Sequence, residues 1–187
     1  KNYLLNIYIE LSKQLINKDD SQETQDKALE YVFKSKEYIT TDEDKIQCDS
    51  YLAWLYDKYE AYDLAEELLK SVISSGRDDI WINSEYGYCL GELKKLNESL
   101  EHYLRARELG RNDAWIHSQI AWTYRLLGRY EEALESAFKA QEIGQNDTWI
   151  NVEIGISYKE LGNYEEALKY YLIANNIKKK KNVWLLS

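Results

Sequence analysis

A seven-residue pattern recurs along the chain at a fixed interval of 34 residues. Its three copies begin at Gly76, Gly110 and Gly144 and read Gly-Arg-Asp-Asp-Ile-Trp-Ile, Gly-Arg-Asn-Asp-Ala-Trp-Ile and Gly-Gln-Asn-Asp-Thr-Trp-Ile. In a sequence with helical spacing, this period is typical of stacked helix pairs, in which each pair buries its apolar face against its neighbours. The interval therefore predicts an all-α fold, a right-handed superhelical solenoid of antiparallel helix pairs.

The period divides most of the chain into four units of two helices each. In the first helix of a unit, apolar residues recur at spacings of four, four and three, which keeps them on one helical face. Clear examples are Ile116, Ile120, Tyr124 and Leu127, which align with Ile150, Ile154, Tyr158 and Leu161. The predicted units are 46–79, 80–113, 114–147 and 148–181.

The two ends of the chain depart from the period. Residues 1–45 predict a divergent helical hairpin, with helices over 2–17 and 26–39 and a polar loop over 17–25. Residues 182–187 predict the start of a further, truncated segment. Because the chain has no Met and begins at Lys1, we expect it to be a piece of a longer protein.

The turn residues have distinct structural roles. The Gly of each seven-residue copy can take the left-handed conformation that ends a helix. Asp113 and Asp147 stand where a carboxylate caps the next helix, and Asn163 can cap the helix that contains Glu166. Most of the repeated motif is therefore expected to serve the architecture.

Composition narrows the range of functions. A net charge of −9 argues against a broad nucleic-acid surface, and no apolar run reaches the length of a membrane span, so neither nucleic acid nor membrane is an expected partner. Cys48 and Cys89 have no second ligand at metal spacing, which favours buried thiols and a reducing, cytoplasmic setting. His102 and His117 stand apart, so we expect no catalytic residues, no metal and no cofactor.

The repeats resemble the tetratricopeptide repeat family over residues 46–181. The family's Leu-Gly and Tyr positions match Ile154-Gly155 with Tyr158, and its Ala, aromatic and Ala positions match Ala167, Tyr171 and Ala174. The chain departs from the family at two places: Asn83, His117 and Asn151 replace the usual Trp, and Arg77, Arg111 and Gln145 replace the usual Pro. The resemblance implies that the first helices line a concave groove.

Candidate ligand contacts form a second stripe on the first helices. Aromatic residues recur seven positions apart, nearly two helical turns, and polar residues lie between them. The stripe comprises Trp54, Trp81, Ser84, Tyr88, Trp115, Ser118, Trp122, Arg125, Trp149 and Lys159. Two interpretations remain open for the tryptophans: packing between neighbouring units, or anchoring a peptide.

These features predict a non-catalytic scaffold of bacterial type that binds a protein or peptide in an aromatic-lined groove. The alternative is a peptide-sensing arm of a larger signalling or transcription-control protein. The last helix pair has no following unit, so we expect exposed apolar surface around Tyr170, Ile173 and Ile177 and self-association through that end.

Overall fold

A computed structural model describes residues 2–19 and 21–184, with side chains as far as residue 179. These residues form α-helices and one short 3-10 helix, with no strand among them, so the expected all-α fold is confirmed. The chain divides into two compact units, residues 1–93 and residues 94–187. The predicted repeat 80–113 contributes its first helix to the first unit and its second helix to the second unit.

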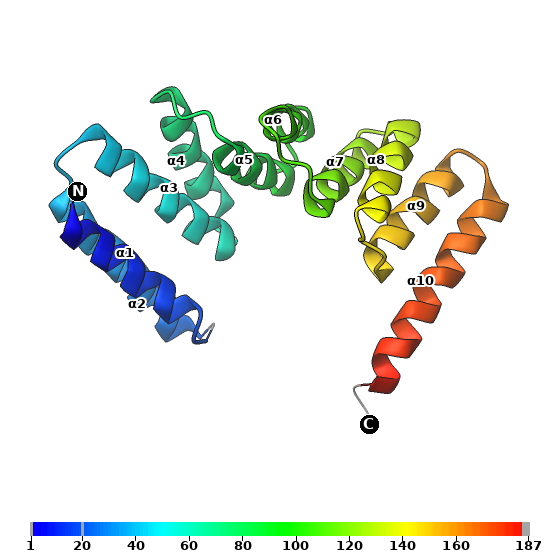
Figure 1. Cartoon of the computed structure of the whole chain (residues 1–187), viewed down its shortest axis with the longest axis horizontal. Helices are drawn as coiled ribbons and strands as arrows, with labels where there is room; N and C mark the ends of the chain where they lie inside the picture. Colours follow the sequence, from blue (N-terminus) through cyan, green and yellow to red (C-terminus); the bar gives the residue numbers. More distant parts are fainter. Residues whose placement is uncertain (1, 20, 185–187) are drawn as a thin grey trace. The chain divides into compact units, whose positions relative to one another are not determined.

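The first unit contains five α-helices and the 3-10 helix η1 (Figure 1). Helices α1 and α2 form an antiparallel hairpin, α3 pairs with α4, and α5 packs against α4. Two clusters of buried residues hold these helices together, one around Leu5, Val32 and Leu52 and one around Leu69, Ile82 and Leu90. The bounds are α1 (Tyr3–Ile16), α2 (Gln22–Ser35), η1 (Lys36–Tyr38), α3 (Asp42–Lys58), α4 (Tyr62–Ser74) and α5 (Ile80–Glu92).

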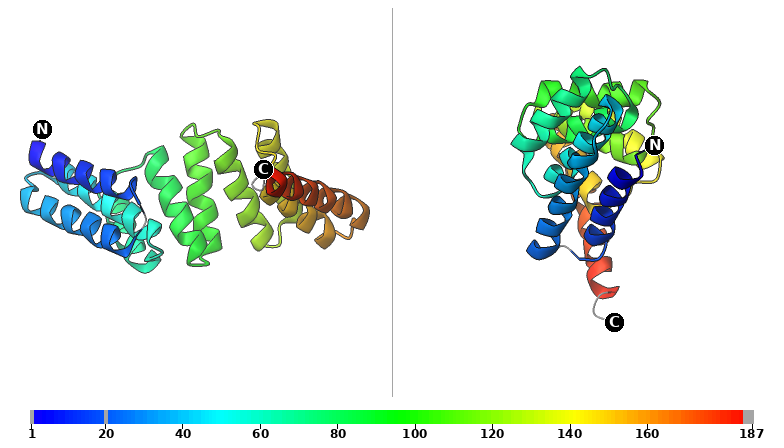
Figure 2. Two further views of the ribbon diagram at one scale, coloured as in Figure 1. Left: turned by 90° about the horizontal axis from the view of Figure 1, so that it is seen from below. Right: turned by 90° about the vertical axis from the view of Figure 1, so that its left-hand side faces the viewer.

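The second unit contains the remaining five helices, which follow one another as packed neighbours (Figure 2). Its core gathers Ala121, Leu134, Ala137, Ile150 and Ile154. The bounds are α6 (Leu96–Glu108), α7 (Ala114–Leu126), α8 (Tyr130–Glu142), α9 (Thr148–Glu160) and α10 (Tyr164–Trp184).

The predicted turn chemistry is present at each repeat. Asp79, Asp113 and Asp147 each precede a helix, and their Oδ1 atoms accept the backbone N–H of the isoleucine three positions later, at 2.9, 2.8 and 2.9 Å. Gly110 and Gly144 have φ values of 109° and 115°, a region that residues with a Cβ rarely adopt. Each repeat boundary is thus set by a left-handed Gly and a capping Asp.

Two predicted boundaries near the ends differ from the structure. Helix α2 begins at Gln22, earlier than expected, because the Ser21 hydroxyl accepts the N–H of Thr24 and Thr24 is itself buried. Helix α10 continues through Trp184, and the rest of the predicted segment 182–187 lies outside the described residues. No helix in the described part of the chain is both long and apolar enough to cross a membrane.

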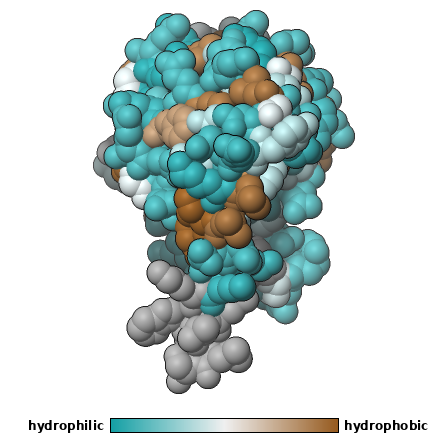
Figure 3. All heavy atoms as spheres, turned by 90° about the vertical axis from the view of Figure 1, so that its right-hand side faces the viewer, coloured by the Kyte–Doolittle hydropathy of each residue, from teal (hydrophilic) through white to brown (hydrophobic). Residues whose placement is uncertain are grey.

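The outer face of α10 carries an exposed apolar stripe, although its residues differ from those expected. Tyr164, Leu168 and Leu172 recur every fourth residue and are 69, 59 and 53% exposed. Tyr170, Ile173 and Ile177 are instead half-buried, and Tyr170 stacks on Tyr158 of α9 with ring centroids 5.8 Å apart. Figure 3 shows hydrophobic side chains gathered on this end of the second unit.

Candidate functional site

Two of the repeated tryptophans lie under an arginine that the capping Asp holds in place, a contact that was not predicted from the sequence. In the first unit the Arg77 guanidinium lies 5.2 Å from the centre of the Trp81 ring, and its Nε donates to Asp79 Oδ2 at 2.7 Å. In the second unit Arg111 lies 4.1 Å from the centre of the Trp115 ring and donates to Asp113 Oδ2 at 3.0 Å. One Asp thus caps the helix and also orients the Arg that covers the Trp.

The third copy has no Arg at this place. Gln145 stands at this place and donates to Asp147 Oδ2 at 3.3 Å, but a neutral amide cannot make the same cation–π contact. Trp149 is 38% exposed, whereas Trp81 and Trp115 are half-buried. Trp115 also meets the Tyr103 ring edge-on at 5.9 Å, so it packs between neighbouring helices.

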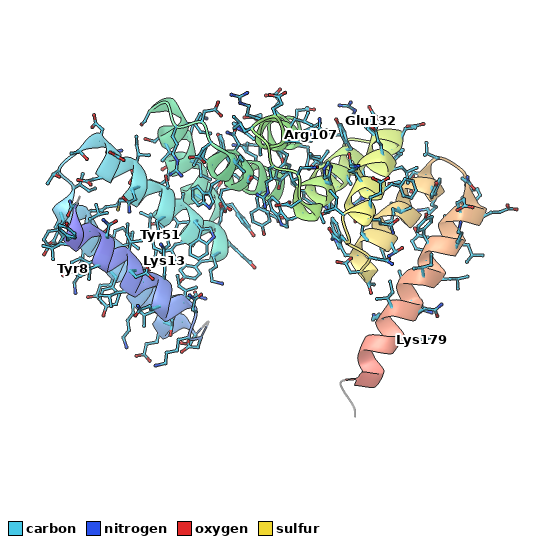
Figure 4. All side chains as sticks on the ribbon, in the orientation of Figure 1. Tyr8, Lys13, Tyr51, Arg107, Glu132 and Lys179 are labelled. Carbon is cyan, nitrogen blue, oxygen red and sulfur yellow. The ribbon has the colours of Figure 1, made fainter. Side chains whose placement is uncertain are left out.

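Two predicted aromatic residues of the first unit line one pocket of about 420 Å³, here called the aromatic pocket. Trp54 stacks on Tyr51 with ring centroids 5.5 Å apart, and Trp81 lies under Arg77. Lys13 approaches from α1, with its Nζ 5.6 Å from the centre of the Tyr51 ring (Figure 4). The lining residues are Lys13, Asn17, Gln47, Ser50, Tyr51, Trp54, Arg77 and Trp81.

Trp54 also lines a second pocket of the same unit, of about 310 Å³, here called the acidic pocket. Tyr88, another predicted residue, is part of it and meets the Tyr62 ring edge-on at 6.3 Å. Carboxyl groups come from the end of α3, the turn after it and α5. The lining residues are Trp54, Asp57, Lys58, Glu60, Tyr62, Glu85 and Tyr88.

Asp57 has an unusual environment at this pocket. The residue is only 4% exposed, and neither carboxylate oxygen has a hydrogen-bond partner among the residues that the structure describes. Burial raises the pKa of Asp57 to about 7, and the charge of Glu85 raises it further. The Cys89 thiol donates to the Tyr62 carbonyl at 3.2 Å.

The two predicted serines do not form a ligand surface, which corrects the sequence-based expectation. Ser84 is fully buried and donates to the Ile80 carbonyl at 2.6 Å, while Ser118 is 2% exposed and donates to the Trp115 carbonyl at 2.8 Å. Both hydroxyls serve the backbone of their own helix, as buried polar groups usually do. They therefore take no part in the candidate site.

The two predicted cations of the second unit have partners within the protein. Arg125 forms a two-bonded ion pair with Glu153, in which Nη2 donates to Oε1 at 3.3 Å and Nε donates to Oε2. These side chains are 17% and 8% exposed. Lys159 pairs with Glu160 at 2.9 Å. Trp122 lies near Lys94, whose Nζ is 5.4 Å from the ring centre.

His117 lies in a structural contact. Its Nε2 is 2.7 Å from Asn112 Oδ1, and burial lowers its pKa. Asn151 makes the equivalent contact one repeat later, donating to Asn146 Oδ1 at 2.9 Å. Cys48 and Cys89 are both buried and outside any disulfide, and no cluster of three or more potential metal ligands occurs in the described part of the chain.

The sequence analysis did not select Asp57, Arg77 or Tyr51 as site residues. For Asp57, alignment of the repeats would have indicated a difference. Asp57 stands 68 and 102 positions before Arg125 and Lys159, two and three periods of 34. The first unit therefore has an acid where two later repeats have a cation. Such a reversal of charge at one register position marks a place where the first unit differs chemically from the second.

Comparison with known proteins supports the repeat assignment. The family model "Tetratricopeptide repeat" matches residues 114–146 and 150–180. No curated protein matches the chain.

Similar solved structures extend over nearly the whole chain. MamA MSR-1 is 21% identical with a TM-score of 0.78, over 96% of this chain and 97% of MamA. MamA AMB-1 is 20% identical with a TM-score of 0.75, over 95% of this chain and 91% of MamA. YrrB, described as a TPR protein with an unusual peptide-binding site, is 22% identical with a TM-score of 0.75, over 92% of this chain and 85% of YrrB. The chain thus has the fold of these helical-repeat proteins, and its residues 114–146 and 150–180 are tetratricopeptide repeats.

Proposed function

We propose that the chain is a non-catalytic scaffold that binds an extended peptide through the aromatic pocket of its first unit. The observation that carries the proposal is the pocket itself. Its volume of about 420 Å³ falls in the range of small-ligand sites, and its walls combine apolar rings with a few polar groups. Likeness to YrrB, a TPR protein with a peptide-binding site, supports the same class of ligand.

The two interpretations of the tryptophans are compatible in this pocket. Trp54 and Trp81 each pack against a buried cluster of the first unit and also line the pocket. One part of each ring is thus held by the core, while another part remains available to a ligand. Aromatic side chains held in this way lose little conformational entropy on binding, which suits them as anchors.

The polar groups of the aromatic pocket define the preferred ligand. Arg77 is fixed by Asp79 and by its hydrogen bond from Nη1 to Ser50 Oγ at 2.7 Å, and Lys13 brings a second cation. Apolar walls with cations at the edge suit an aromatic or aliphatic side chain followed by an acidic group or a carbonyl. We therefore expect an apolar anchor residue with an acidic neighbour.

A peptide array probed with the labelled full chain tests this proposal. Peptides that bind the wild type should bind Trp81→Ala and Lys13→Gln at least about tenfold more weakly, equivalent to about 1.4 kcal/mol. Trp149→Ala is the matched control, because Trp149 stands at the same place in the repeat but outside this pocket. Equal binding by all variants, each shown to be folded by circular dichroism, would refute the proposal.

A further inference from the structure

The acidic pocket can be compared with an equivalent place in the second unit. Arg125 and Glu153 are 28 positions apart in the sequence. Asp57 and Glu85, which stand two repeats earlier, are also 28 positions apart. In the second unit this step joins a guanidinium to a carboxylate in a largely buried ion pair. In the first unit the same spacing places the carboxyl groups of Asp57 and Glu85 near each other, and the charge of Glu85 raises the pKa of Asp57. The first unit therefore has the acids of this arrangement without the arginine.

Asp57 needs a partner at this place. It is 4% exposed, lines the acidic pocket, and neither of its oxygens accepts a hydrogen bond from any described residue. A buried ionised carboxylate is costly unless an opposite charge compensates it. A cation entering the pocket would supply the charge that Arg125 supplies to Glu153.

The walls of the acidic pocket indicate which kind of cation fits. Trp54, Tyr62 and Tyr88 line the same pocket as the carboxyl groups, and the two tyrosine rings meet edge-on at 69°. Organic cations are attracted to the faces of such rings and can pass their methylene groups along them. This combination suits a lysine ammonium or an arginine guanidinium on an aliphatic stem.

We propose that the acidic pocket binds a basic side chain, lysine or arginine, of the peptide held in the aromatic pocket. This inference rests on the proposed peptide-binding function. Because Trp54 lines both pockets, the basic residue would lie close in sequence to the apolar anchor. The two pockets together select a peptide whose apolar anchor has an acidic neighbour for Arg77 and Lys13 and a basic side chain for the acidic pocket.

The chain has its own cation at the rim of this pocket. Lys58 is exposed and lines the acidic pocket next to Asp57. Lys58 competes with a ligand cation for the carboxyl groups of the pocket. The variant Lys58→Gln should therefore bind a basic ligand more tightly than the wild type, by a few fold.

Small probes allow the acidic pocket to be tested without knowing the natural peptide. Nuclear magnetic resonance of the full chain follows the indole N–H signals of Trp54 and Trp81 while N-acetyl-lysine methylamide or N-acetyl-arginine methylamide is added. N-acetyl-norleucine methylamide is the neutral control with a similar stem. We expect the cationic probes to shift the Trp54 signal and the neutral probe to leave it unchanged. Trp81 is the internal reference, since it lines only the aromatic pocket.

Two substitutions of Asp57 make the test specific. Asp57→Asn keeps the size of the side chain and removes its charge, so the probes should bind about tenfold more weakly or be lost. Asp57→Arg places a guanidinium opposite Glu85, as in the second unit, and should abolish probe binding while preserving or raising the melting temperature. Unchanged binding by a folded Asp57→Asn protein, or no shift of Trp54 in the wild type, would overturn the inference.

The outcomes separate this inference from the proposed function. In one outcome, peptide binding requires Trp81 but shows no preference for lysine or arginine on the array, and the probes do not bind. This result would support peptide binding by the aromatic pocket and refute the role of the acidic pocket. Probe binding that depends on Asp57, in a chain that captures no peptide, would refute the peptide-binding function and support the acidic pocket as a cation site.

Discussion

The stability of Asp57→Asn relative to the wild type should increase as the pH rises. The pKa of Asp57 is about 7 in the folded protein, against an ordinary value of 3.8, because the carboxyl is buried. Between these two values the folded chain holds a proton that the unfolded chain releases. The free energy of unfolding of the wild type therefore falls as the pH rises through this window, whereas an asparagine contributes no such change.

The size of the effect follows from the two pKa values. A difference of about 3 units corresponds to about 4 kcal/mol at high pH, of which about 3 kcal/mol falls between pH 4.5 and pH 8. The buried amide brings its own cost, about 1 to 3 kcal/mol, but that cost does not vary with pH. The test is therefore how much the difference in unfolding free energy between Asp57→Asn and wild type changes from pH 4.5 to pH 8. We expect a change of about 3 kcal/mol.

Urea unfolding followed by circular dichroism at pH 4.5, 6 and 8 measures this quantity. Asp57→Ala is the control: it should show a different constant offset, because it leaves a cavity, but the same variation with pH, because it also lacks the carboxyl. A stability difference that stays constant from pH 4.5 to pH 8 would refute the reasoning. It would mean that the Asp57 carboxyl is solvated in the folded protein.

Three further predictions concern packing and charge in the second unit. Gly155→Ala should lower the free energy of unfolding in urea by about 1 to 3 kcal/mol, because the new Cβ would come 2.7 Å from Tyr171 Cε1. A smaller loss in the Tyr171→Ala background would confirm that contact, and an equal loss there would contradict it. Arg125→Ala should cost about 3 kcal/mol by leaving Glu153 buried and unpaired, whereas Arg125→Met with Glu153→Leu should cost less. Leu168→Lys with Leu172→Lys should shift any self-association towards monomer in size-exclusion chromatography with light scattering, and an unchanged association would place the contact elsewhere.

The fold was predictable from the sequence because its determinants are local and repeated. Gly144 and Asp147 fix the boundary between two helices through backbone conformation and one capping bond, which act within a few residues. Gly155 shows the limit of this reasoning. The family resemblance places a small residue at 155, but the structure shows that Tyr171 of the next helix lies against it. In the preceding repeat Ala121 and Ala137 stand at the places of Gly155 and Tyr171, so a small residue on one helix offsets a large one on the next.

The candidate site was less predictable because it depends on departures from the repeat. Trp54 and Trp81 were identified by periodicity, but periodicity gives every tryptophan the same role, and the structure distinguishes them by the residues beside them. Arg77 covers Trp81, while Trp149, which has Gln145 at the matching place, is more exposed. Ser84 and Ser118 occupied the predicted stripe, yet each bonds to its own helix backbone. A position on a helical face therefore does not establish access to a ligand.

Asp57 is the most informative residue of the site, because it departs most from the repeat. A repeat scaffold can satisfy a buried charge by placing its opposite 28 residues away, as Arg125 and Glu153 do. At the corresponding step of the first unit, an arginine would complete the core and close the acidic pocket. The aspartate instead leaves a buried carboxyl beside Glu85, with aromatic rings around it. A buried carboxylate without an opposite charge is unfavourable, and the proposed basic side chain of the peptide would compensate it.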